Sequence, residues 1–162
     1  MLYKRDPTHF IENGSPVTLL NTDYKGYTTL LDNRFKTEME RKVVLEKSQT
    51  GFRTSHQIQD PVIKLQYAME ESSRLKKQVY LCYLDWFSAF CSIDLPRLYL
   101  LMEKMGMQPE DVQLIKNAHD GAWVVVRTPF GDTARIQVTR GTPQGDVLSS
   151  SLFIFFLNLC LR

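Results

Sequence analysis

The chain has few of the features that mark secreted, disulfide-rich or zinc-binding proteins. Only three of its 162 residues are cysteines, and they are odd in number and widely spaced. This pattern argues against a disulfide framework and against a zinc site. Cys82 and Cys160 lie in apolar runs, so we expect them to be small core residues in a reducing compartment.

Long apolar runs and a strong excess of one charge are also absent. The strongest apolar run, 152–161, is shorter than the roughly 20 residues that cross a bilayer. The N-terminus turns polar too early for a signal peptide, so we expect an intracellular protein with no membrane contact. The net charge of +2 gives no general argument for nucleic acid.

Basic residues gather locally in two places. They outnumber acidic neighbours in a first cluster and follow a predicted helix in a second, and each cluster suits either a solvated helix face or a surface that faces phosphates. The first cluster is Arg34, Lys36, Arg41, Lys42, Lys47 and Arg53, and the second is Arg74, Lys76 and Lys77.

The first half of the chain predicts two helices and one strand. Apolar residues recur at helical spacing from about 22 to 43. Asp60 and Pro61 suit the start of a second helix, whose apolar stripe is Val62, Leu65, Ala68 and Met69. The continuous apolar run 79–84 predicts a strand that is buried on both faces and ends at Asp85.

The second half predicts helices around one hairpin. In chain order we expect a helix capped by Asp94 and closed by Gly106, a helix from Pro109 to about Gly121, strands at 123–128 and 133–139 joined by a turn at 129–132, and a helix from about Asp146. There is no internal repeat and no regular βαβ order, so the fold class is α+β in a single domain.

Two segments carry candidate chemistry. Residues 83–90, Tyr-Leu-Asp-Trp-Phe-Ser-Ala-Phe, hold one carboxylate after an apolar run. Residues 141–146, Gly-Thr-Pro-Gln-Gly-Asp, form a loop in which Gly141 and Gly145 allow close backbone approach, Pro143 adds stiffness, and Asp146 can cap the next helix. By residue type alone, Asp85 suits a turn or cap better than a metal site, and the loop suits a plain connection.

Together and in this order, the two segments resemble motifs A and B of reverse transcriptases, particularly those of non-LTR retrotransposons. The resemblance implies that Asp85 is the catalytic, metal-binding carboxylate. It places Trp86, Phe90, Gln144 and Gly145 at the incoming deoxynucleotide, with Phe90 as the ring that excludes a ribose 2′-hydroxyl. A simple core role for Phe90 stays open.

Two upstream segments extend the resemblance to about residues 13–162. Residues 49–53, Gln-Thr-Gly-Phe-Arg, resemble motif 2, which implies that Arg53 grips the triphosphate. Residues 15–25 resemble motif 1, although Ser15 replaces its arginine, and Cys91 replaces an acid that relatives carry after motif A. The implied architecture is a right-hand polymerase, with fingers at about 13–78 and an incomplete palm at about 79–162.

The implied reaction is addition of deoxynucleotides to a primer 3′-hydroxyl with two Mg²⁺ ions, or Mn²⁺, on an RNA template. The sequence contains no Asp-Asp dipeptide, which motif C of this family would supply. We therefore expect partly liganded metal, no polymerisation by this chain alone, and self-association through an exposed palm edge. The alternative is a non-enzymatic nucleic-acid-binding or scaffold domain. The nucleus is a location that suits a retroelement product.

Overall fold

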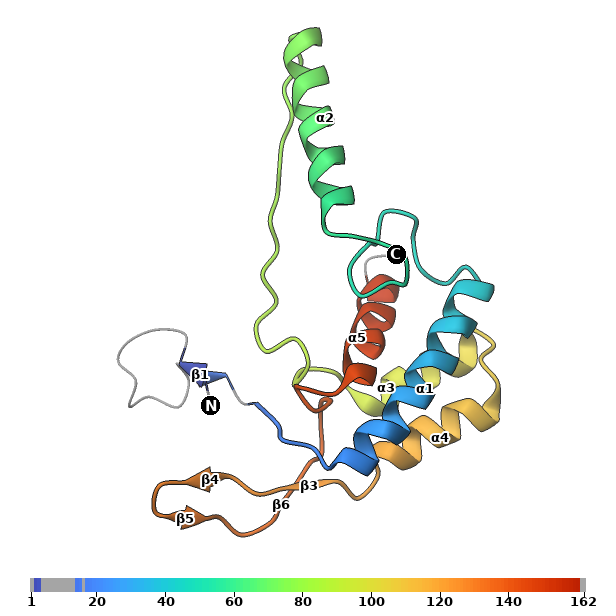
Figure 1. The fold of residues 1–162 in the computed structure, drawn as a ribbon. Coiled ribbons are helices and arrows are strands. Elements are labelled where there is room, and N and C mark those ends of the chain that lie inside the picture. The colour runs from blue at the N-terminus through green and yellow to red at the C-terminus, as the bar shows by residue number, and fades with distance from the viewer. Residues whose placement is uncertain (1, 4–13, 16, 161–162) are drawn as a thin grey trace.

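The structure is a computed structural model that describes residues 2–3, 14–15 and 17–160, so the start of the motif 1 resemblance lies partly outside the described residues. Its elements in chain order are β1 (Leu2–Tyr3), β2 (Gly14–Ser15), α1 (Thr22–Arg41), α2 (Gln59–Leu75), α3 (Leu95–Lys104), α4 (Pro109–His119), β3 (Trp123–Val124), β4 (Arg127–Thr128), β5 (Gly131–Asp132), β6 (Ile136–Gln137) and α5 (Val147–Cys160). Figure 1 shows α1, α3, α4 and α5 gathered in one body, from which α2 and the β3–β6 segment project.

Helix α1 is the longest element and faces α5 across the core. It begins after Asn21, whose side-chain oxygen accepts a hydrogen bond from the Asp23 amide at 2.9 Å. Phe35 of α1 and Phe155 of α5 meet edge to face, with ring centroids 5.5 Å apart and an interplanar angle of 62°. The helical periodicity predicted from about 22 to 43 is therefore confirmed, and its apolar face forms the α1–α5 interface.

Buried polar side chains also join α1 and the loop after it to α5. Ser151 donates to Asp32 at 2.5 Å, and the Lys36 ammonium lies 2.7 Å from the other Asp32 oxygen. Asn158 donates to the Val44 carbonyl at 2.9 Å and accepts from the Glu46 amide at 3.0 Å. Because a buried polar group loses stability without a partner, these pairings fix how α5 lies along α1.

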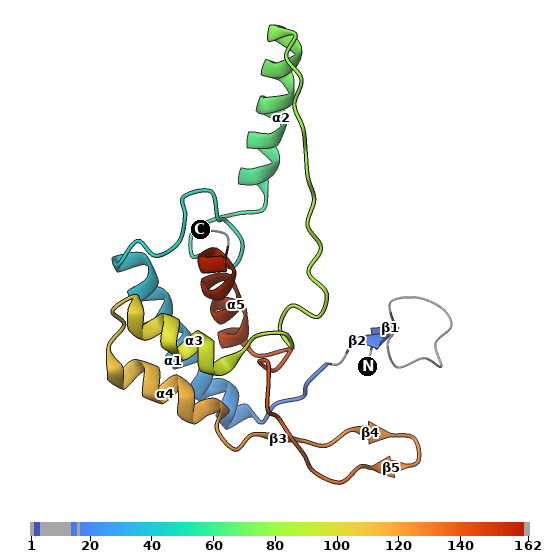
Figure 2. The same cartoon turned by 180° about the vertical axis from the view of Figure 1, so that it is seen from behind.

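The helices and the hairpin predicted in the second half form, although Gly131–Asp132 of the predicted turn belong to strand β5. Asp94 caps α3 by accepting from the Arg97 amide at 3.0 Å, and α4 begins at Pro109. β3 pairs with β6, and β4 pairs with β5, both antiparallel, so the predicted hairpin forms in two short ladders. Figure 2 shows this hairpin extending away from the helices. The mixture of helices and short strands is consistent with the α+β class.

The strand predicted at 79–84 is wrong. Residues 77–86 have no ladder partner among the described residues, and the apolar side chains of 79–84 are exposed. Tyr80 and Phe87 each keep 88% of their surface accessible. A strand buried on both faces needs neighbours on both sides, and no described segment supplies one. The segment instead runs in extended form from the far end of α2 back to the core (Figures 1 and 2).

The apolar stripe of α2 and the cysteines also differ from expectation. Helix α2 forms where predicted, but it has no buried residue, and Val62 and Met69 of its stripe are exposed. Cys82 and Cys160 are exposed rather than in the core. The apolar pattern of α2 correctly indicates a helix, but periodicity cannot reveal whether another element covers the stripe.

No helix in the described part of the chain has the length and apolar character needed to span a bilayer.

We expect Phe155→Ala to lower the free energy of unfolding by about 3–5 kcal/mol, because it removes a fully buried ring from the α1–α5 interface. Urea unfolding followed by circular dichroism measures the change. Phe130→Ala is the matched control, since the Phe130 side chain is 100% exposed and its loss should change stability by less than about 0.5 kcal/mol. Equal effects of the two variants would contradict this description of the core.

Candidate functional site

The loop at 141–146 is joined by its backbone to the end of the motif A resemblance. The Gly141 amide donates to the Ile93 carbonyl at 2.9 Å, and the Thr142 amide donates to the Phe90 carbonyl at 3.0 Å. The Arg140 guanidinium adds a hydrogen bond to the Ser92 carbonyl at 3.0 Å. Two segments far apart in the sequence are thus held side by side by main-chain bonds, which do not depend on side-chain identity.

Gly141 is required for this contact. Its φ is +79°, and a Cβ at this position would lie 2.6 Å from the Cα of Cys91 and 2.7 Å from the Cys91 carbonyl oxygen. Both contacts are with backbone, which cannot move aside as a flexible side chain could. Any larger residue would therefore separate the loop from residues 90–93.

The other side of the loop rests on the segment before α1. The Thr18 amide donates to the Gln144 carbonyl at 2.9 Å. Gly145 has φ +118°, and a Cβ there would lie 2.9 Å from the Thr18 carbonyl oxygen. Three segments that carry the resemblance, around Thr18, Phe90 and Gln144, therefore meet at one place. The Gln144 side chain is half-buried there.

Asp146 holds the loop to α1 and is not seen to cap α5. Its side chain is buried, and one carboxylate oxygen accepts from the Thr28 hydroxyl at 2.7 Å. The other oxygen has no hydrogen-bond partner among the described residues. The predicted capping role is thus corrected: the carboxylate lies where α5 begins, but its hydrogen bond runs to α1. Within the loop, the Ser149 hydroxyl donates to the Pro143 carbonyl at 2.9 Å.

Titratable side chains surround Asp146 in the core. The Tyr24 hydroxyl donates to the Ala118 carbonyl at 3.1 Å, and burial together with the Asp146 charge raises the pKa of Tyr24 to about 12. His119 is buried, with Nδ1 at 2.8 Å from the Ile115 carbonyl, and burial lowers the pKa of its imidazole. The burial of His119 was not predicted from the sequence. Its place on the apolar face of α4, at the i+4 position from Ile115, was the available signal.

The remaining motif A residues are less enclosed. Phe90 is half-buried, and its ring lies 5.5 Å from that of Phe153 at 52°. Asp85 and Trp86 are exposed on the extended segment. The structure thus brings Phe90 to the loop that carries Gln144, whereas no hydrogen bond or ion pair is described between Asp85 and that loop.

Arg53 is engaged within the chain. It forms a two-pronged pair with Glu40 at 2.8 and 2.6 Å and donates to the carbonyls of Glu46 and Gln49. Its side chain is only 11% exposed, and the hydrogen bonds with Glu40 raise the pKa of Arg53 and lower that of Glu40. Four of its N–H donors are used in this way, so gripping a triphosphate would require this arrangement to open.

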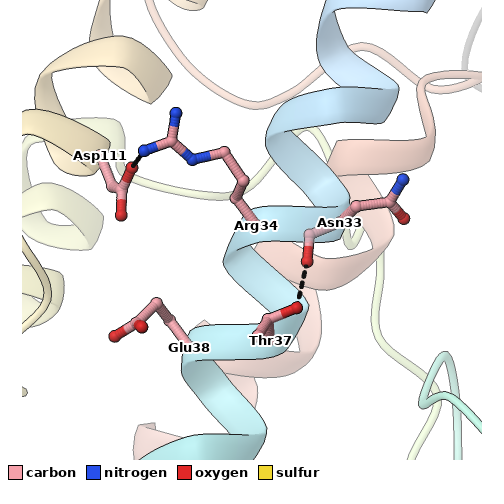
Figure 3. Close-up of a pocket in the computed structure, with 5 residues that line it drawn as sticks. All are labelled: Asn33, Arg34, Thr37, Glu38 and Asp111. Atoms are coloured by element: carbon pink, nitrogen blue, oxygen red, sulfur yellow. Dashed lines mark hydrogen bonds and ion pairs between the residues drawn. The ribbon is translucent and has the colours of Figure 1, made fainter.

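Other basic side chains of the first cluster are paired in a similar way. Arg34 meets Asp111 at 2.5 Å and Arg41 meets Glu38 at 2.8 Å, while Lys42 donates to the Gly106 carbonyl. Figure 3 shows the Arg34–Asp111 pair at a pocket between α1 and α4 that Asn33, Thr37 and Glu38 also line. This pairing favours a solvated helix face over a surface that faces phosphates.

A pair of Mg²⁺ ions needs several carboxylate oxygens held close together. Among residues 17–160 and the two described N-terminal pairs, no three histidine, cysteine, aspartate or glutamate side chains gather in a way that could hold a metal ion. Asp85 alone does not fit a two-metal site, and the structure gives no reaction step through one.

Residues 6–162 match the family described as reverse transcriptase (RNA-dependent DNA polymerase). The match covers nearly the whole chain, so the chain belongs to the reverse transcriptase family, as the resemblance of its motifs predicted. In this chain, main-chain hydrogen bonds hold the segments that carry the motif A and motif B resemblance against each other.

Two relatives point to mobile elements. The chain is 26% identical over 163 residues to the transposon TX1 uncharacterized 149 kDa protein of Xenopus laevis, which covers 99% of this chain and 12% of that protein. It is 29% identical over 147 residues to the RNA-directed DNA polymerase from mobile element jockey of Drosophila funebris, which covers 90% of this chain and 16% of the relative. The chain therefore spans only a small part of the length of either relative.

We expect Gly141→Ala to destabilise the loop much more than Gly121→Ala does. Both glycines have positive φ, so both variants carry the strain of a left-handed side chain, about 1–2 kcal/mol. Only at Gly141 would the Cβ also collide with backbone, since nothing lies within 4 Å of a Cβ at Gly121. Hydrogen exchange of the amides at positions 141 and 142 measures how often the loop opens. Similar exchange rates in the two variants would contradict the close approach.

We expect the free energy of unfolding to fall in acid because of the buried His119 side chain. Burial lowers the folded-state pKa, so below about pH 6.5 the unfolded chain binds the imidazole proton more readily than the folded chain does. This contribution is complete above that pH and declines below it. Urea unfolding from pH 8 to 5 measures the loss, which should be smaller in His119→Gln than in the matched variant His56→Gln. Identical pH profiles for the two variants would exclude this role for His119.

Proposed function

We propose that this chain forms part of an RNA-directed DNA polymerase, with fingers at about 13–78 and part of the palm at about 79–162. The family membership supports the activity class. The support from geometry is the meeting of the segments around Thr18, Phe90 and Gln144, because a nucleotide pocket must be built from several segments held in fixed register.

In this proposal the 141–146 loop is one wall of the nucleotide pocket. Its backbone is fixed by neighbours on two sides, while the Gln144 side chain makes no hydrogen bond within the described residues. Phe90 stands beside it, with its ring supported by Phe153. A supported aromatic ring next to a fixed loop can exclude a ribose 2′-hydroxyl by its bulk. Asp85 and Trp86 would approach the nucleotide from the extended segment, and Arg53 would bind the triphosphate after release from Glu40.

Divalent metal ions serve the reaction in this family, and Asp85 is the one carboxylate that the motifs assign to them here. One carboxylate with water holds Mg²⁺ weakly. We therefore expect residues 1–162, as a purified polypeptide, to add no deoxynucleotide to a primed RNA template in either Mg²⁺ or Mn²⁺. Primer extension on a sequencing gel measures this outcome. Extension that is lost in Asp85→Asn would overturn the expectation of inactivity and would support Asp85 as the metal ligand.

Photo-crosslinking tests the pocket without requiring catalysis. In the presence of primed RNA and Mn²⁺, an azido-deoxynucleoside triphosphate should label peptides that contain Phe90 or Gln144. A ribonucleoside triphosphate should compete poorly with the native chain and about as well as the deoxy form with Phe90→Val, because the smaller side chain admits the 2′-hydroxyl. Phe156→Val, on the half-buried face of α5, is a control for lost aromatic packing. Labelling that avoids both peptides would contradict the pocket.

A non-enzymatic scaffold or nucleic-acid-binding role is the second candidate. Two observations favour it: the described residues gather no metal-binding group of three, and Arg53 is bound to Glu40. Under this role, the chain would bind RNA or DNA in a fluorescence anisotropy titration but would show no specific labelling by the triphosphate. Binding with labelling favours the polymerase.

The exposed 79–84 segment supports self-association. Its backbone is extended and unpaired within the described chain, and its apolar side chains are exposed, which are the properties of an edge that pairs with another strand. We expect concentration-dependent dimers in sedimentation velocity. Tyr83→Lys should weaken them, since a charge on the edge opposes pairing, whereas Tyr67→Lys on exposed α2 should not. A monomer at all concentrations would exclude this association.

A further inference from the structure

Two buried side chains, on α4 and just before α5, each have one atom that finds no hydrogen-bond partner in the described part of the chain. Asp146 is 4% exposed and His119 is 6% exposed. Within the described residues, Asp146 Oδ2 and His119 Nε2 have no partner, and the buried Tyr99 hydroxyl also has none. Buried polar atoms of this kind are nearly always satisfied, so each requires a physical explanation.

Contacts made by α1 bring these two side chains to the same region. Thr28 donates to Asp146, and Tyr24, one turn earlier on the same face of α1, donates to the carbonyl of Ala118, which precedes His119. The charge of Asp146 acts on the imidazole of His119 and on the phenol of Tyr24. Because such effects weaken with separation, they agree with the placement that the hydrogen bonds give.

The hydrogen bond of His119 decides what its free nitrogen can do. Nδ1 lies 2.8 Å from the Ile115 carbonyl, and a carbonyl only accepts, so Nδ1 carries the proton. In the neutral ring Nε2 is then an acceptor. Asp146 Oδ2 is a carboxylate oxygen and also accepts. Two acceptors cannot satisfy each other, and they need a small group that donates twice.

We propose that His119 Nε2 and Asp146 Oδ2 bind one internal water molecule, which donates a hydrogen bond to each. Buried waters in proteins typically make about three hydrogen bonds to side chains of this kind. The water connects α4 to the start of α5, in parallel with the direct Thr28 bond from α1.

This bridge makes His119 a positioning residue for the 141–146 loop. That role rests on the proposed function, in which Gln144 of the loop contacts the nucleotide; the water site itself does not. The groups that act on the imidazole are the Ile115 carbonyl, which accepts from Nδ1, and the charges of Asp146 and of Asp120 at the end of α4. When acid protonates Nε2, the nitrogen becomes a donor and the water is no longer needed between it and the carboxylate.

Nitrogen-15 NMR of the full 162-residue chain tests the acceptor pair directly. The His119 ring signals are assigned by their loss in His119→Gln, and His56→Gln separates them from another histidine. We expect the Nδ1-protonated tautomer at pH 7, with a titration midpoint below about 6.5. Asp146→Asn should lower that midpoint further, because the carboxylate charge that favours the imidazolium is removed. An Nε2-protonated tautomer, or a midpoint that Asp146→Asn leaves unchanged, would overturn the proposal.

The water is detected by a nuclear Overhauser effect between solvent and the His119 ring protons in the native chain, with the sign of a long-lived bound molecule. No such effect, in spectra where other buried waters give one, would refute the bridge. This measurement needs no variant and therefore stands even if substitutions prevent folding.

Two pairs of variants, one at Thr28 of α1 and one at the histidines, test whether His119 positions the loop. Thr28→Ser keeps the hydroxyl and Thr28→Val removes it at similar volume. We expect amide exchange at Thr142 and Asp146 to rise about tenfold in Thr28→Val and in His119→Leu, but not in Thr28→Ser or His56→Gln. Unchanged exchange in His119→Leu would deny the role. If NMR supports the water while the triphosphate fails to label the loop, the polymerase proposal fails and the water site remains.

Discussion

The contact between the backbones of Gly141 and Cys91 is the constraint on which the arrangement of this protein's motifs depends. A Cβ on residue 141 would lie 2.6 Å from the Cα of Cys91, so the two segments approach as closely as main chain allows. The hydrogen bonds from the Gly141 and Thr142 amides then set the register. A contact made by backbone atoms tolerates wide changes in side chain, provided that residue 141 stays glycine. The side chain at position 91 can therefore vary without separating the two segments.

Helix α1 organises the rest of the molecule around that contact. Its apolar face packs on α5 through Phe35 and Phe155. Its polar side chains bind Asp146, just before α5, through Thr28, and Ser151 of α5 through Asp32. The apolar contacts supply most of the stabilisation, because they remove large side chains from water. The polar contacts fix how α1 and α5 lie along each other, since each hydrogen bond forms in only one relative position of the two helices. The 141–146 loop is therefore held by the core itself, and we expect changes on α1 to alter the position of Gln144.

Local signals gave most of the helices, and long-range pairing caused the errors. Asp94, Pro109 and the glycine-rich turn before α5 act within a few residues, so their effects could be read directly. The strand at 79–84 failed because an apolar run reports only a tendency to be buried, not the presence of neighbours. Asp146 was expected to cap α5 for a similar reason: its position at the helix start was visible, but its hydrogen bond to Thr28 spans 118 positions.

The sequence by itself determined the family, the order of the helices and the identity of the loop, because these follow from residue types at short spacing. Only the tertiary structure decided which groups meet. It brought Phe90 and Gln144 together, bound Arg53 to Glu40, and buried His119 near Asp146. The physical reason is that hydrogen bonding and burial depend on distance in space, and a one-dimensional pattern does not specify which distant residue will supply the partner.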